Sequence, residues 1–148
     1  GSLLDNNFYG NPEYEKSSKE ERLVALEKSG LGSLLTHFQQ GLDTQIQTSG
    51  DTISLGQRQL IAFVRAVLRK PELLILDEAT ANIDTVTEQL LGQALEKLPK
   101  ETTTVVIAHR LNTIENADEI FFVNGGEVTA AGSLDKAVEM LMHGKRAT

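Results

Sequence analysis

The chain has 148 residues, and 40% of them are hydrophobic, so it can bury a sizeable core and disorder is not expected. Its net charge of -7 argues against a nucleic-acid partner and against polybasic binding to anionic lipid, because both need clustered Lys and Arg. Without cysteine, disulfides and thiolate metal sites are excluded. The apolar runs are too short to span a bilayer, and no secretory signal opens the sequence. Gly1 and Ser2 could stem from cloning, so they are assigned no structural role.

The first third of the sequence shows helical patterns. Residues 17–31 predict a helix capped by Ser17 or Ser18, with two glutamates in its first turn and Gly30 at its end. A shorter helix is predicted over residues 31–41, and a polar stretch follows it.

A longer helix is predicted between Ser54 and Pro71. Ser54-x-x-Gln57 is a capping box, in which each residue bonds the backbone of the other, and proline stops the far end. The helix carries one broad apolar face made of Leu60, Ile61, Phe63, Val64, Val67 and Leu68.

Two apolar runs predict buried parallel strands. They are "LLILDE" at residues 73–78 and "TTTVVIAHR" at residues 102–110. A helix between them makes a right-handed crossover, so Asp77, Glu78 and His109 should meet at the carboxyl edge of the sheet. Two acids and a histidine at that edge suggest chemistry on a phosphate or on a metal-bound water.

The connecting helix is predicted over residues 84–98. Asp84 or Thr85 is its cap, and Thr85-x-x-Glu88 is a candidate capping box. After the second strand, a hairpin should turn at Asn124-Gly125, and a last helix should close the chain.

Taken together, these stretches resemble the ATP-binding subunit of ABC transporters. "ISLGQRQ" is similar to the family signature, "LLILDE" to Walker B, "ANID" to the D-loop and "VIAHR" to the switch-histidine loop. The four motifs occur in the family's order from Ile53 to Arg110, a combination far more specific than any one of them. "GQRQ", "DEAT" and "AHRL" resemble the exporter branch, and "YGNPE" with the helices after it resembles the α-helical subdomain.

The resemblance implies ATP as ligand and Mg²⁺ as cofactor. It makes Glu78 and His109 the catalytic residues: Glu78 would orient the attacking water, and His109 would contact the γ-phosphate. Asp77 would support Mg²⁺, largely through water. Taken alone, each of these side chains could be no more than a polar residue at a strand end.

Five further residues are implied to contact ATP bound on the opposite subunit. They are Ser54, Leu55, Gly56 and Gln57 of the signature, together with Asp84 of the D-loop. A helix N-terminus is itself an anion site, so capping and phosphate binding can coexist at Ser54.

Walker A is absent, because the one "GK" is followed by Arg146 and has Glu139 where the motif needs its first glycine. The fold expected is α/β, a partial P-loop NTPase parallel sheet with an α-helical subdomain. Residues 1–70 would form that subdomain, and residues 71–148 the C-terminal part of the ATPase core. Such a truncated chain should bind ATP weakly, should not turn it over, and should self-associate through its open strand edge.

Leu55 departs from the commonest signature, LSGGQ, in which a glycine stands at this position. In heterodimeric exporters, the half with an intact Walker B glutamate commonly carries the altered signature. Leu55 together with an intact Glu78 therefore favours a heterodimer with a second nucleotide-binding domain.

The remaining partner implied is the transmembrane domain of the transporter, which places the subunit on the cytoplasmic face of the cell membrane. A chromosome-maintenance ATPase shares the signature and Walker B, but coiled-coil heptads and basic surface are lacking here. A regulatory module that binds ATP without hydrolysis is the third alternative, and the intact Glu78 and His109 argue against it.

Overall fold

The computed structural model describes residues 1–36, 38, 40–46, 53–77, 84–108 and 111–143. They form helices and short strands, so the α/β class predicted from the sequence is confirmed. The chain folds as two compact units, Gly1–Ile75 with Ala79–Val105, and Leu76–Glu78 with Val106–Thr148. The boundary predicted between residues 70 and 71 separates two subdomains of the family fold, not these two compact units. It stays a prediction.

A short helix that was not predicted opens the first unit. Helix α1 (Leu3–Phe8) begins after Ser2, whose Oγ accepts a hydrogen bond from the N–H of Asp5. The backbone before the helix is held as well, because the N–H of Ile46 donates to the carbonyl of Gly1. Gly1 and Ser2 therefore have a structural role, contrary to expectation.

Helix α2 (Lys19–Lys28) follows as predicted, and Ser18 rather than Ser17 is its cap. Ser18 and Glu21 form a reciprocal capping box, which satisfies two backbone N–H groups at the start of the helix. Gly30 has a φ of +72° just beyond the helix end, a conformation that glycine adopts without strain.

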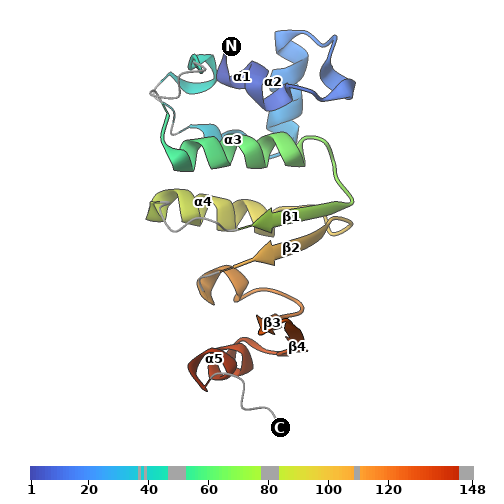
Figure 1. The fold of residues 1–148 in the computed structure, drawn as a ribbon. Coiled ribbons are helices and arrows are strands. Elements are labelled where there is room, and N and C mark those ends of the chain that lie inside the picture. Colours follow the sequence, from blue (N-terminus) through green and yellow to red (C-terminus); the bar gives the residue numbers. More distant parts are fainter. Residues whose placement is uncertain (37, 39, 47–52, 78–83, 109–110, 144–148) are drawn as a thin grey trace. The chain divides into compact units, whose positions relative to one another are not determined.

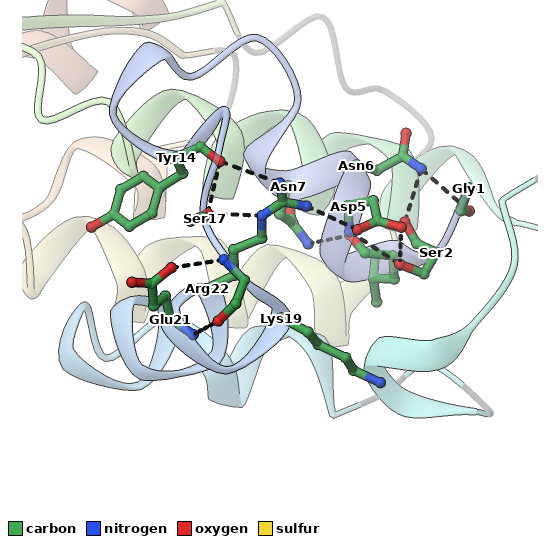
Figure 2. A network of polar contacts seen from close by, with 12 residues as sticks. Gly1, Ser2, Asp5, Asn6, Asn7, Tyr14, Ser17, Lys19, Glu21 and Arg22 are labelled. Atoms are coloured by element: carbon green, nitrogen blue, oxygen red, sulfur yellow. Dashed lines mark hydrogen bonds and ion pairs between the residues drawn. The ribbon is translucent and has the colours of Figure 1, made fainter.

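Arg22 of α2 ties this helix to the start of the chain (Figure 2). Its Nη1 donates to Oδ1 of Asp5, its Nε to Oγ of Ser17, and its Nη2 to the carbonyl of Tyr14. Tyr14 ends the 3₁₀ helix η1 (Pro12–Tyr14). One planar guanidinium thus joins α1, η1 and α2.

Helix α3 (Leu55–Val67) supplies much of the core of the first unit. It contacts α1, α4 and the 3₁₀ helix η2 (Gly32–Leu35). Burial of its apolar face against α1 and η2 is the main stabilising contribution expected here. The buried apolar residues of these helices include Leu3, Leu4, Phe8, Leu26, Leu60, Ile61, Phe63 and Val64.

The helix predicted over residues 31–41 was wrong in extent. The described part of this stretch forms only η2, and the 3₁₀ helix η3 (Gly41–Asp43) begins where the predicted helix should end. Short i to i+3 bonds close these turns, as from the N–H of Thr36 to the carbonyl of Ser33.

The end of α3 is held by the segment that precedes α2. Nδ2 of the buried Asn11 donates to the carbonyl of Leu68, and Nη2 of Arg69 donates to the carbonyl of Gly10. Lys70 then takes a positive φ of 52°, and the helix has ended before Pro71, as predicted.

Strands β1 (Leu73–Asp77) and β2 (Thr103–Ile107) are neighbours in a two-stranded sheet, and their arrows in Figure 1 point the same way. Helix α4 (Thr85–Glu96) connects them, as predicted. The expectation that both strands are buried was wrong, because Ile75 is 60% exposed and Ile107 49% exposed. Local apolar runs predicted the strands, but burial depends on which other elements cover them.

The second unit contains a hairpin packed on a helix. Strands β3 (Phe121–Asn124) and β4 (Glu127–Ala130) pair antiparallel, and α5 (Leu134–His143) packs against β3. The turn lies one residue later than predicted, at Gly125-Gly126. Both glycines have positive φ, as the two central residues of a type I′ hairpin turn do.

Candidate functional site

The first turn of α3 carries the predicted signature residues. Oγ of Ser54 accepts a hydrogen bond from the N–H of Gln57 at 3.1 Å, and Oε1 of Gln57 accepts one from the N–H of Ser54 at 3.0 Å. The predicted capping box is therefore confirmed, and it fixes both side chains at the positive end of the helix dipole.

The first turn of α4 is capped by Asp84. Oδ2 of Asp84 accepts from the N–H of Thr87 at 3.0 Å, and Oδ1 accepts from its hydroxyl at 2.7 Å. Thr85 is already helical, so the capping box proposed between Thr85 and Glu88 was wrong. The hydroxyl of Thr87, followed by its backbone N–H, lowers the pKa of the Asp84 carboxyl.

Gly56 brings these two helix starts together. A Cβ at this position would lie 3.0 Å from Oγ1 of Thr87 and 3.1 Å from Oδ1 of Asp84. Helices α3 and α4 contact each other within the first unit and start at the same end in Figure 1. The structure therefore brings five predicted residues to one place, namely Ser54, Leu55, Gly56, Gln57 and Asp84.

Leu55 differs from Gly56 in its surroundings. Its side chain is 49% exposed, whereas Gly56 is buried against α4. Among the residues that the structure describes, none accepts a hydrogen bond from the N–H of Leu55 or Gly56. Two such N–H groups at a helix N-terminus can bind an anion.

Of the three residues predicted at the strand ends, only Asp77 lies among the described residues. Asp77 is the exposed last residue of β1, while Glu78 and His109 lie outside the described residues. An exposed carboxylate suits a hard cation such as Mg²⁺, which keeps several waters and takes only one or two protein carboxylates. Within the described ranges, no group of three or more His, Asp or Glu could hold a metal ion.

A match to a family model identifies the family of this chain. The family model described as "ABC transporter" matches residues 4–81, more than half of the chain. The chain belongs to the ABC transporter family. This agrees with the resemblance drawn from the four motifs.

Individual relatives give the same result. The chain is 44% identical over 138 residues to an uncharacterized ABC transporter ATP-binding protein, YfiC, of Bacillus subtilis, covering 93% of this chain and 22% of that protein. It is 48% identical over 119 residues to an ATP-dependent lipid A-core flippase of Pasteurella multocida, covering 80% and 20%. The Francisella tularensis flippase is 40% identical over 140 residues, covering 93% and 23%.

The chain spans about a fifth of the length of these ABC relatives. None of the helices that the structure describes is long and apolar enough to cross a bilayer.

Sequence reasoning missed Thr87. Its side chain is only 6% exposed, and it donates twice to Asp84. An aspartate followed three residues later by a threonine at a helix start could have indicated the pair, because an N-cap carboxylate accepts from that residue's N–H.

Proposed function

We propose that the chain is part of the ATP-binding and ATP-hydrolysing subunit of an ABC exporter at the cytoplasmic face of the cell membrane. The observation that carries this proposal is the meeting of the α3 and α4 N-termini at Gly56, in a chain of the ABC transporter family. Relatives named as ATP-dependent flippases support ATP as the energy source and export as the process.

The N-terminus of α3 then forms one half of an ATP site whose phosphate loop belongs to another subunit. The N–H groups of Leu55 and Gly56 and the Ser54 hydroxyl contact the γ-phosphate, helped by the dipole of α3. Gln57 keeps Ser54 in place through the capping box. Asp84, held beside this turn, reaches the same interface.

The residues that follow or end strands β1 and β2 belong to a second ATP site, in which the nucleotide is bound by this chain's own subunit. Asp77 would hold Mg²⁺, which would supply positive charge to offset the negative charge of the phosphates. Glu78 orients and polarises the attacking water, and His109 contacts the γ-phosphate. Phosphoryl transfer needs positioning and charge compensation above all, so these few groups suffice.

The partners are a transmembrane domain and a second nucleotide-binding domain. Leu55 stands where the family's usual signature has glycine, whereas the Walker B glutamate, Glu78, is present. This pairing favours a heterodimer in which Glu78 works opposite the partner's signature and Leu55 faces the slower site.

ATP turnover of the full-length protein that carries this sequence tests the proposal. Glu78→Gln removes the carboxylate that orients water, and we expect ATP hydrolysis to fall by about a hundredfold or more. Glu101→Gln makes the same chemical change at an exposed position outside the site and should leave the rate unchanged. Equal rates for wild type and Glu78→Gln would exclude this catalytic assignment, and a homodimer with full transport-coupled activity would exclude the heterodimer.

A further inference from the structure

We propose that Thr87 is a positioning residue that fixes the Asp84 carboxylate against the first turn of α3. The N-termini of α3 and α4 then contact the nucleotide in one fixed arrangement. This inference rests on the proposed function, because it assigns Thr87 a role in the same ATP site.

The geometry of the Asp84–Thr87 pair is the first support. Thr87 uses its hydroxyl for one carboxylate oxygen and its N–H for the other, at 2.7 and 3.0 Å. The N–H bond alone would cap the helix, and it restrains only one of the two carboxylate oxygens. The hydroxyl bond restrains the other oxygen as well. The lowered pKa of Asp84 agrees with two donors acting on its charged form.

The contact with Gly56 is the second support. The three atoms nearest to a Cβ placed there are Oγ1 of Thr87 at 3.0 Å, Oδ1 of Asp84 at 3.1 Å and Cγ2 of Thr87 at 3.2 Å. The atoms that form the hydroxyl–carboxylate bond are therefore the ones packed on α3. Thr87 thus sets where Asp84 lies relative to Ser54 and Leu55.

A purely structural role makes a different prediction. If Thr87 only stabilised α4, loss of its hydroxyl would lower stability without a specific effect on catalysis. If it positions Asp84 across the subunit interface, the loss should lower kcat for ATP hydrolysis and leave KM for ATP unchanged, because ATP binds its own subunit first.

The experiment compares three variants of the full-length protein. Thr87→Val keeps the side-chain shape and removes the donor, Thr87→Ser keeps the donor, and Thr85→Val makes the same chemical change at an exposed position of the same turn. We expect kcat to fall about tenfold in Thr87→Val with KM within about twofold of wild type. Thr87→Ser should restore most of kcat, and Thr85→Val should match the wild type.

A second readout uses the 148-residue chain. The pKa of the Asp84 carboxyl, followed by NMR titration, should rise in Thr87→Val and stay low in Thr87→Ser. An unchanged kcat in Thr87→Val would overturn the inference, as would an equal loss in Thr87→Val and Thr87→Ser. Glu78→Gln separates this result from the proposed function: if it abolishes turnover while Thr87→Val does not alter it, only the present inference fails.

Discussion

At the residue scale, neighbouring positions 55 and 56 serve different purposes. Gly56 lies where any side chain would press on Asp84 and Thr87, whereas Leu55 is half exposed. The sequence alone showed that the second signature glycine is retained, and it gave no reason for this retention within the subunit. The close approach of two helices supplies that reason, since a Cβ at position 56 would come within 3.0–3.2 Å of Asp84 and Thr87 and would force these side chains to shift.

Gly56→Ala should therefore lower the free energy of unfolding. Gly92→Ala in α4 is the matched control, because a Cβ at Gly92 would meet nothing within 4 Å. Alanine is favoured over glycine within a helix by about 0.8–1.0 kcal/mol, so Gly92→Ala should be stabilising. Chemical denaturation of both variants measures the difference, and an equal gain in both would show that the contact with α4 has no energetic cost.

At the element scale, the sequence predicted α3 well and missed α1. Helix α3 has thirteen residues, a capping box and a broad apolar face, so local patterns suffice. Helix α1 has only six residues, and its stability depends on packing against α3 and on the cap from Ser2.

For the strands and the candidate site too, local sequence patterns predicted only part of the structure. Motif resemblance located Ser54 and Asp84, and the structure places Asp84 against Gly56, two residues after Ser54. The partner of Asp84, namely Thr87, lies outside the motifs that were recognised. The apolar runs of β1 and β2 indicated burial, whereas the resemblance to a longer family fold predicted an open edge at β2. The exposed side chains agree with the second expectation, because burial depends on contacts between distant parts of a protein.

Asn11 offers a test of how the end of α3 is held. Asn11→Ala leaves the carbonyl of Leu68 without its donor and removes the acceptor for the N–H of Glu13, so it should destabilise by about 1–3 kcal/mol. Asn11→Asp keeps the acceptor and loses the donor. In thermal or chemical unfolding, Asn11→Asp should recover at most about half of the stability that Asn11→Ala loses. If Asn11→Asp were as stable as the wild type, the hydrogen bond to Leu68 would contribute nothing.

At the scale of the whole molecule, the exposed apolar side chains of the β1–β2 sheet should drive self-association of the 148-residue chain. Leu73 and Ile75 of β1 and Val105 and Ile107 of β2 are all exposed. Exposed apolar strands invite pairing with another copy. Sedimentation velocity should show concentration-dependent oligomers that Ile75→Lys weakens. A strictly monomeric, highly stable chain would argue against an open sheet.

The central claim is that the first turn of α3 binds the phosphate of a nucleotide held by another subunit. Leu55→Glu tests it directly, because a carboxylate in the first turn suits the helix dipole but repels a phosphate. Leu55→Gln is the neutral control. The measurement is the dissociation constant of the ATP-bound dimer, in the full-length protein with Glu78→Gln to prevent turnover.

We expect Leu55→Glu to raise this dissociation constant at least about tenfold, equivalent to roughly 1.4 kcal/mol, relative to Leu55→Gln. The affinity of the isolated subunit for its own ATP should stay the same in both variants. A dimer unaffected by the added charge, or a loss of ATP affinity in the isolated subunit, would contradict the account.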